Sequence, residues 1–277
     1  MTEKAKEKAD ILVEAINYIN KFEGKIVVVK YGGNAMENEE LKESVFTDIS
    51  MLSQLGLKIV VVHGGGPDID AEMKMKKIEK KVIGGLRVTD ETTMKVVEKV
   101  LKNVNKECVS ILKKTGAKAV DCTNNLLWTE MKDERLGFVG EITSVDKQKI
   151  FRKLNKGIIP VISSLGKDEK TSHATNINAD TAATEIAIAL KAEKLTIMTN
   201  VDGVLKGGEL LPHLTLNDVK KYIKSGVISG GMIPKVEACV DAVTHGVKKA
   251  HLINGTTKRA LLIEIFTEKG VGTEIVR

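Results

Sequence analysis

The chain has 277 residues, of which 42% are hydrophobic and 29% charged, enough for one large α/β domain or two lobes that share a sheet. Lysine and arginine exceed aspartate and glutamate by 43 to 37, and this net charge of +6 is spread along the chain, which fits small anionic substrates. Only 3% of the residues are aromatic, so the stacking surface that single-stranded nucleic acid requires is scarce and we expect no nucleic-acid partner.

The three cysteines, Cys108, Cys122 and Cys239, form no C-x-x-C spacing and no metal-ligand pattern with nearby histidines. We therefore expect reduced thiols, a cytoplasmic location and no metal ion held by protein ligands. The charged N-terminus is not followed by the apolar region of a signal peptide, and no apolar run approaches the roughly 18 residues of a membrane helix. We expect no association with a membrane.

The first part of the chain predicts alternating helices and strands. Residues 3–22 carry a stripe of alanine, leucine and isoleucine, so we expect an amphipathic helix whose apolar face packs either on this chain or on another copy. A strand at 25–29 and a helix at 39–55, ended by Gly56, follow. Residues 57–66 repeat the order of strand and glycines before another helix. Two such units predict a right-handed parallel α/β sheet.

The rest of the chain continues the alternation. We expect a long helix at 89–114, capped by Thr89 or Asp90, and short strands within 118–128 and 136–142. Further elements are predicted as strands at 157–163, 195–199, 249–253 and 272–276 and as helices at 179–190, 217–225, 234–246 and 259–266. The polar stretch before Asn178 is the best boundary between two lobes.

Glycine turns follow the first two strands, as Gly32-Gly33 and as Gly64-Gly65-Gly66. In open parallel sheets, ligands bind at the carboxyl ends of the strands, where glycine turns and helix N-termini present backbone N–H groups to anions. Neither turn has P-loop or dinucleotide-site spacing. Lys30 directly precedes the first turn, where a lysine either snorkels from the sheet edge or contacts an anion. The adjacent glycines favour phosphate contact.

A second lysine occupies an unfavourable place on a helix. Pro234 fits the first position of a helix, so Lys235 lies in the first turn, where the macrodipole disfavours a cation by some tenths of a kcal/mol. A shared anion would offset this cost. The helix at 179–190 opens with Asn176, Asn178 and Asp180, of which an N-cap explains only one. Asp180 can hold both lysines, and an asparagine can bind substrate.

Seven motifs, in chain order, resemble the N-acetylglutamate kinase family of the amino acid kinase superfamily. They are KYGGNAM (30–36), VVHGGGPDI (61–69), GLRVTD (85–90), GFVGEI (137–142), NINADTAATEIA (176–187), GGMIPKVEAC (230–239) and EIFTEKGVGTEI (264–275). The resemblance covers nearly the whole chain after residue 24. It implies a three-layer αβα sandwich with an open, mainly parallel central sheet, an N-lobe at 24–176 for amino-acid binding and dimerisation, and a C-lobe at 177–277 for ATP.

The resemblance also implies the reaction. ATP and Mg²⁺ would serve the phosphorylation of the side-chain carboxylate of N-acetyl-L-glutamate to N-acetyl-L-glutamyl 5-phosphate, the second step of arginine biosynthesis. A side-chain carboxylate has a reference pKa of about 4.3, so the nucleophile is ionised at neutral pH and needs no general base. In-line positioning and neutralisation of phosphate charge are then sufficient for catalysis.

The site residues that the resemblance implies fall into three groups. The catalytic residues would be Lys30, Lys235 and Asp180, with Asp180 organising the two lysines. The substrate-binding residues would be Gly64, Gly65, Arg87, Asn176 and Asn178, and the phosphate- or nucleotide-binding residues Gly32, Gly33, Asn200, Gly203 and Gly231. Asn200 departs from the family pattern, which usually has aspartate at this place, so contacts with ATP are expected to differ.

Regulation and assembly are also implied. The helix at residues 1–23 is similar to the extension through which arginine-regulated hexameric members join their dimers, so we expect a homodimer or a hexamer. Glu264 and Gly270 match the region of an arginine effector site. Arg259 stands where that class often has histidine, and we expect its guanidinium to repel a cationic effector.

Two alternatives remain beside this function. One is the same chemistry on N-acetyl-aminoadipate or a related acid, since one methylene discriminates by only about 1–3 kcal/mol. The other is a catalytically weak protein that senses arginine or a nucleotide. Asn200 is its only support, whereas the joint presence of Lys30, Asp180 and Lys235 speaks against it.

Overall fold

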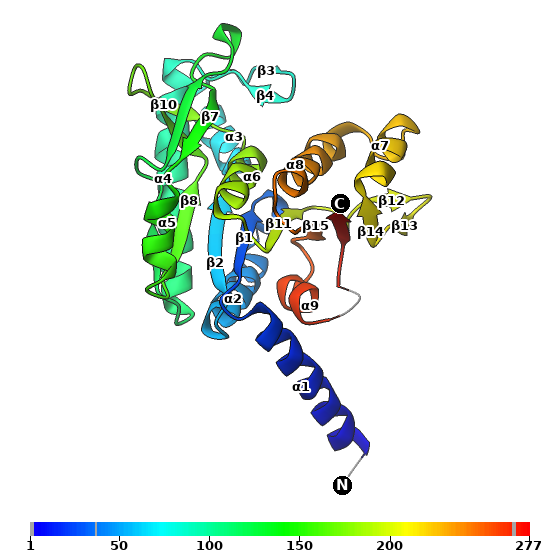
Figure 1. Ribbon diagram of the computed structural model, residues 1–277. Coiled ribbons are helices and arrows are strands. Elements are labelled where there is room, and N and C mark those ends of the chain that lie inside the picture. The colour runs from blue at the N-terminus through cyan, green and yellow to red at the C-terminus, as the bar shows by residue number, and fades with distance from the viewer. Residues whose placement is uncertain (1–2, 37, 268–269) are drawn as a thin grey trace.

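The computed structural model describes residues 3–36, 38–267 and 270–277. Its centre is an eight-stranded sheet that is parallel except where β15 and β16 pair (Figure 1). In spatial order the strands are β14 (His213–Thr215), β16 (Thr273–Val276), β15 (Lys249–Asn254), β11 (Lys194–Thr199), β1 (Ile26–Tyr31), β2 (Lys58–His63), β8 (Ile159–Ser163) and β5 (Ala119–Asp121).

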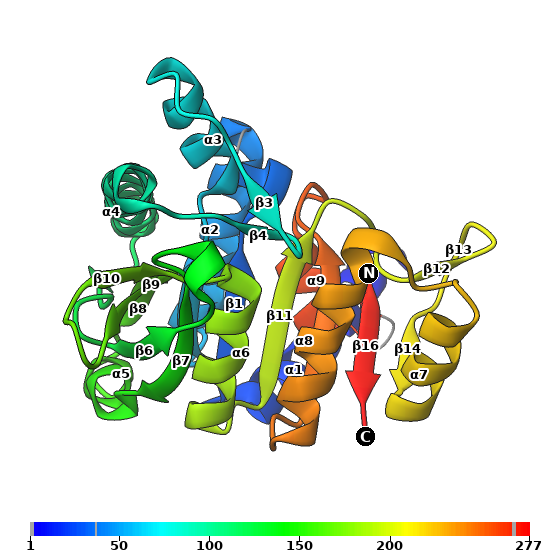
Figure 2. The same cartoon turned by 90° about the horizontal axis from the view of Figure 1, so that it is seen from above.

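Helices cover both faces of this sheet, which gives the expected three-layer αβα sandwich (Figure 2). Side chains alternate between the faces, so Val27 and Val29 of β1 belong to one buried cluster and Val28 to the other. One face packs on α2 (Glu39–Gln54), α4 (Glu91–Lys114) and α9 (Ala260–Phe266), and the other on α5 (Lys147–Leu154), α6 (Ala179–Leu190), α7 (Leu216–Lys224) and α8 (Ile233–Thr244).

The remaining elements are smaller. A second sheet has the order β10 (Ala174–Asn176), β9 (Leu165–Asp168), β6 (Leu127–Met131) and β7 (Gly140–Val145). Two hairpins are formed by β3 (Val82–Ile83) with β4 (Leu86–Arg87) and by β12 (Leu205–Lys206) with β13 (Glu209–Leu210). The short helices are η1 (Gly33–Met36), α3 (Gly66–Met75), η2 (Glu134–Leu136) and η3 (Gly230–Met232).

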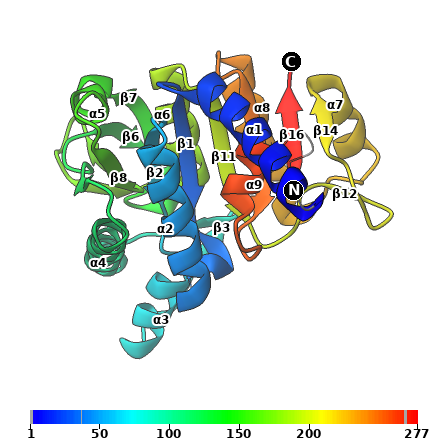
Figure 3. The same cartoon turned by 90° about the horizontal axis from the view of Figure 1, so that it is seen from below.

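The first helix, α1 (Glu3–Phe22), projects from the body of the protein (Figures 1 and 3). Its last residue, Phe22, is buried in the core cluster that includes α9, so this end of the helix covers its own chain. Val13 and Ile16 are 60% and 52% exposed, which leaves apolar surface on the projecting part. The side chains of Ala5, Ala9 and Leu12, which belong to the expected apolar stripe, lie outside the described ones.

Most element boundaries agree with the sequence predictions. Helix α6 spans the predicted residues, Asp90 rather than Thr89 caps α4 by accepting from the Thr93 N–H, and Gly56 has the positive φ of +94° expected after α2. Strand β1 was expected to end at residue 29. This boundary is wrong, because Lys30 and the next residue still pair with neighbouring strands.

Strands β9 and β10 were not predicted. They are short and lack apolar alternation, and a buried hydrogen bond of 2.9 Å between Thr129 and Thr175 helps to join their sheet. The three cysteines are buried and unpaired, as expected. Over the described part of the chain, we find no helix with the length and apolarity needed to cross a membrane.

Candidate active site

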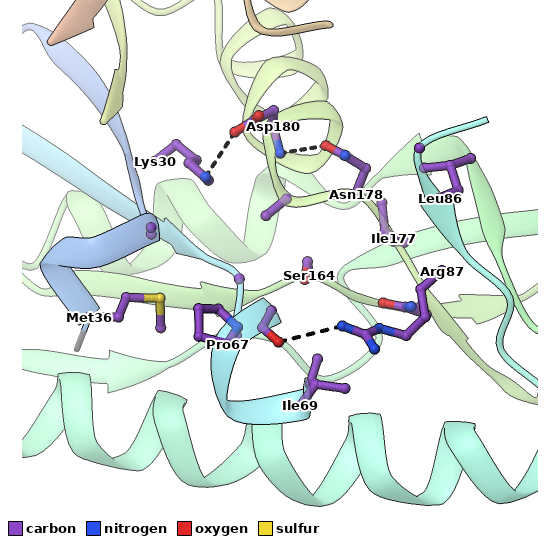
Figure 4. Close-up of a pocket in the computed structure, with 18 of the residues that line it drawn as sticks. Lys30, Met36, Pro67, Ile69, Leu86, Arg87, Ser164, Ile177, Asn178 and Asp180 are labelled. Carbon is purple, nitrogen blue, oxygen red and sulfur yellow. Dashed lines mark hydrogen bonds and ion pairs between the residues drawn. The ribbon is translucent and has the colours of Figure 1, made fainter. Parts of the chain in front are cut away.

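A cavity of about 310 Å³ lies at the carboxyl ends of β1 and β2, beside the N-terminus of α6 (Figure 4). Its size is in the range of small-molecule sites. The structure brings together nine of the residues that the sequence predicts for the site, and all nine line this cavity: Lys30, Gly32, Gly33, Gly64, Gly65, Arg87, Asn176, Asn178 and Asp180. The rule that ligands bind at the carboxyl edge of a parallel sheet predicts a site at this edge, and the structure has a cavity there.

Asp180 binds both predicted lysines. Its Oδ1 lies 3.0 Å from Nζ of Lys30, and its Oδ2 lies 2.8 Å from Nζ of Lys235. Burial raises the pKa of Asp180, but the two ammonium groups outweigh this effect and hold its pKa below the usual value. Two ammonium groups against one carboxylate leave a surplus positive charge beside the cavity, which Lys30 lines and Lys235 does not.

Local structure fixes these three side chains. Lys30 lies on β1 within the sheet, whereas Asp180 and Lys235 lie in the first turns of α6 and α8, two helices that pack against each other. Asn178 caps α6, and its Oδ1 accepts from the N–H groups of Asp180 and Thr181 at 2.8 and 3.1 Å. Because the cap uses that oxygen, Asn178 keeps its amide nitrogen for the predicted contact with substrate.

The first turn requires glycine because neighbouring side chains approach its backbone closely. A Cβ on Gly32 would lie 2.9 Å from Nζ of Lys30, so a side chain would displace the ammonium group. Gly33 has a φ of +73°, and its Cβ would lie 2.4 Å from Oδ1 of Asn200. Asn200 itself does not line the cavity. Its side chain packs against the turn.

The second glycine turn lies between α6 and α4. A Cβ on Gly64 would approach that of Ala179 at 3.2 Å, and a Cβ on Gly65 would approach Cδ2 of Leu101 at 2.9 Å. Among the described residues, no backbone carbonyl outside the regular helices and strands accepts from the amides of Gly64, Gly65 or Gly66. Backbone donors at the start of α3 are thus left for an anion.

Arg87 is held beside the cavity by several contacts. Its Nη2 lies 2.5 Å from Oδ1 of Asp70, and its Nη1 lies 3.1 Å from Sδ of Met73. Nη2 also donates to the carbonyl of Gly66 at 3.4 Å (Figure 4). A guanidinium group has five N–H donors, so these contacts orient Arg87 without using all of them. The Nδ2 of Asn176 donates to Oγ1 of Thr89 at 3.1 Å, and this bond fixes the orientation of the Asn176 carboxamide.

Three of the five residues predicted to bind phosphate or nucleotide are not brought to this cavity. Asn200, Gly203 and Gly231 do not line it. Gly203 has a φ of +146°, and its Cβ would lie 2.5 Å from Oγ1 of Thr273, so packing on β16 alone requires glycine here. Gly231 lies in η3, directly before the helix that carries Lys235.

The sequence analysis missed several residues of the cavity wall. Those with side chains are Met36, Pro67, Ile69, Leu86, Val139, Ser164, Ile177 and Ala179, to which Gly66 and Gly85 add backbone. Ser164 directly follows β8, so the rule that selected the glycine turns was sufficient to find it. The apolar residues gave no such signal, because their pattern is that of ordinary core.

A second cavity of about 570 Å³ contains Glu264 and Gly270. Glu264 lies 3.1 Å from Nζ of Lys194 and 2.5 Å from Nδ1 of His251. Burial raises the pKa of Glu264, but the histidine and lysine reverse this effect and lower it to about 2. Gly270 has a φ of +58°, and a Cβ there would lie 2.5 Å from Oε2 of Glu264.

Arg259 forms its ion pair outside this second cavity. Its Nη1 lies 2.7 Å from Oδ1 of the buried Asp48 on α2, and Arg259 is not among the residues that line the cavity. The charge of this guanidinium is paired with Asp48, which weakens the repulsion that the sequence predicts; the repulsion itself stays a prediction.

The fold and the site define a class of phosphoryl-transfer enzymes, and residues 25–254 match the model described as the amino acid kinase family. The acetylglutamate kinase of Caldanaerobacter subterraneus subsp. tengcongensis is 48% identical over 280 residues, which cover 97% of this chain and 93% of the relative. That of Desulforamulus reducens is 44% identical over 281 residues, with 98% of both chains covered. The chain belongs to the acetylglutamate kinases of the amino acid kinase family.

Among solved structures, the chain is similar to N-acetylglutamate synthase from Neisseria gonorrhoeae complexed with coenzyme A and L-arginine. The TM-score is 0.85 at 25% identity, and the similarity covers 97% of this chain but only 65% of that one. The likeness extends the fold assignment to nearly the full length of the chain.

Proposed function

We propose that the protein transfers the γ-phosphoryl group of ATP to the side-chain carboxylate of N-acetyl-L-glutamate, giving N-acetyl-L-glutamyl 5-phosphate in arginine biosynthesis. The names of its relatives support this substrate. The observation that carries the proposal is Asp180 held between Lys30 and Lys235 at 3.0 and 2.8 Å, at the edge of the cavity.

The chemistry requires relief of repulsion between two anions. The attacking carboxylate is ionised at neutral pH, so no proton has to be removed from it. Lys30 and Lys235 neutralise the charge that spreads over the oxygens of the transferred group, and Asp180 holds both ammonium groups in place before the substrates meet. Backbone amides of Gly33, Gly64 and Gly65 add donors that need no reorganisation.

The acid is oriented by the opposite wall of the cavity. Arg87, fixed by Asp70, binds the α-carboxylate with its remaining donors. Asn176 and the amide nitrogen of Asn178 bind the acetamido and carboxylate region. With the α-carboxylate at Arg87, the side-chain carboxylate points towards Lys30, as phosphoryl transfer requires.

ATP approaches from the C-lobe at 177–277, across Asn200, Gly203 and Gly231, and its γ-phosphate reaches the lysines. The N-lobe at 24–176 holds the acid. Mg²⁺ would be held by the phosphates of ATP, because Asp180 is the one carboxylate among the described residues of the cavity wall and both of its oxygens face lysines. Among the described residues no group of three His, Cys, Asp or Glu side chains is arranged for a metal ion, so these side chains do not fit a metal held by protein.

The second cavity is proposed as an arginine effector site, at Glu264 and Gly270. It is lined by both carboxylates and cations, the two kinds of group that a free amino acid with a basic side chain needs. The solved synthase relative is complexed with L-arginine, which supports this choice.

The exposed Val13 and Ile16 on α1 support assembly of a homodimer or hexamer. The three unpaired cysteines support the cytoplasm as the location of the protein.

The direct test is to trap the acylphosphate with hydroxylamine in the presence of ATP and either N-acetylglutamate or N-acetyl-aminoadipate. We expect kcat/KM for N-acetylglutamate to exceed that for the longer acid by about tenfold or more, since one methylene is worth about 1–3 kcal/mol in a shaped pocket. A higher kcat/KM for the longer acid would show that N-acetyl-aminoadipate, and not N-acetylglutamate, is the substrate. If no hydroxamate forms with any acid, the proposed enzymatic function is contradicted, and a protein that only binds its ligands is favoured.

A further inference from the structure

His63 is a buried titratable side chain for which the function above has no use. It is the last residue of β2 and directly precedes the second glycine turn. Its exposed fraction is 0%, and in the sheet register it stands between Tyr31 of β1 and Ser163 of β8. The proposed catalysis does not explain why an imidazole is buried at this edge of the sheet, beside the cavity.

The hydrogen bond of His63 defines its tautomer. Nδ1 lies 2.8 Å from the carbonyl oxygen of Gly64. A carbonyl oxygen can only accept, so Nδ1 carries the proton and donates it. Burial lowers the pKa of His63 to about 4, so the ring is neutral at pH 7 and Nε2 carries no proton.

The bond fixes a turn that has little other restraint. Gly64 lacks a Cβ, and within the described chain no backbone carbonyl outside the regular helices and strands accepts from its amide or from those of the next two glycines. Its carbonyl is held by His63, which limits rotation of the Gly64–Gly65 peptide. The N–H of that same peptide belongs to Gly65, a residue that lines the cavity.

His63 also connects the turn to the opposite wall. Its own carbonyl accepts from the N–H of Ser164 at 3.1 Å, and the carbonyl of Ser164 accepts from the N–H of Ile177 at 3.0 Å. Ser164 and Ile177 both line the cavity. One residue therefore holds the glycine turn by its side chain and the wall that leads to Asn178 by its backbone.

We propose that His63 is a positioning residue for phosphoryl transfer, whose Nδ1–H sets the orientation of the Gly64–Gly65 peptide so that its N–H faces the transferring group. The inference rests on the proposed function. His63 does not line the cavity and has no exposed atom surface to offer a substrate, so it acts through the turn rather than as an acid or base.

The first test compares two substitutions. His63→Leu removes the donor, whereas His63→Asn places an amide N–H close to the former position of Nδ1. We expect His63→Leu to lower kcat by about 10²-fold with KM for both substrates within about threefold, because a misplaced donor is lost mainly in the transition state. His63→Asn should recover kcat to within about fivefold of the wild type.

A matched control is Ile59→Val, on the same strand and the same face but at its distant end. It removes buried volume without touching the turn, so it should lower the melting temperature and leave kcat unchanged. Wild-type kcat in His63→Leu, or equal losses of kcat in the Leu and Asn variants at equal folding, would overturn the proposal.

A second measurement reads the tautomer of His63 in the wild-type protein, so its outcome does not depend on the stability of the His63→Leu variant. In protein labelled with ¹⁵N-histidine, the ring signals of His63 are assigned by their loss in the His63→Asn variant, which separates them from those of the buried His251. We expect the His63 ring to have a protonated Nδ1 and an unprotonated Nε2 and not to titrate between pH 5.5 and 8. A ring protonated on Nε2 would overturn the proposal. Absence of acylphosphate with the wild type would instead overturn the function, so the two failures are distinguishable.

Discussion

Two carboxylates of the described chain, Asp180 and Glu264, each face two basic side chains, but their surroundings differ. Asp180 meets Lys30 and Lys235 at the carboxyl ends of the strands, where the side chain of Lys235 is still 27% exposed. Glu264 meets Lys194 and His251, whose side chains are 5% and 4% exposed, and Lys194 is the first residue of its strand.

The difference is one of charge and place. Two lysines at Asp180 leave a surplus positive charge beside a cavity that has glycine turns and helix N-termini. Burial lowers the pKa of both Lys194 and His251 despite the attraction of Glu264, so His251 is neutral at pH 7 and the second cluster carries no surplus. The same types of group therefore leave a surplus positive charge in one place and a neutral cluster in the other.

The largest effect is expected from removing one ammonium group of the first cluster. Lys30→Met and Lys235→Met should each lower kcat by about 10³-fold, equivalent to about 4 kcal/mol, because the lost charge acts on the transition state. Lys194→Met is the matched control, since it removes the same group from the second cluster. Steady-state kinetics should show its kcat within about threefold of the wild type, and an equal loss in all three variants would remove the distinction.

A smaller effect, on stability rather than rate, is expected at Glu264. Glu264→Gln leaves the buried Lys194 without its counter-charge, so the free energy of unfolding should fall by about 3 kcal/mol in urea titrations. At saturating substrate kcat should stay within about threefold. A large loss of kcat with unchanged stability would show that the second cluster serves catalysis.

The dependence of stability on pH sharpens the same point. The pKa of Glu264 lies below its ordinary value of 4.5, at about 2, so its contribution is complete above about pH 4.5 and is lost as the pH falls towards 2. The unfolding midpoint of the wild type should therefore drop over this window more steeply than that of Glu264→Gln. Parallel curves for the two proteins would mean that Glu264 is not held in its charged form by the fold.

Much of this architecture could be predicted from the sequence because it depends on local rules. Alternating strands and helices, glycines at strand ends and a surplus of polar residues before α6 located the sheet edge and the Lys30, Asp180 and Lys235 cluster. The contacts of Arg87 with Asp70 and of Arg259 with Asp48 were not predictable, because these partners are brought together only by tertiary packing. His63 was passed over since a histidine within an apolar strand is ordinarily core.

The central claim is that two fixed ammonium groups receive the transferring phosphoryl group. It is tested most directly by a crystal structure of the protein with a non-hydrolysable ATP analogue, Mg²⁺ and N-acetylglutamate. We expect Nζ of both Lys30 and Lys235 to lie within hydrogen-bond distance, about 3 Å, of oxygens on the γ-phosphate or its bridge to the acid. Both nitrogens bound only to Asp180, with the γ-phosphate placed elsewhere, would contradict the account.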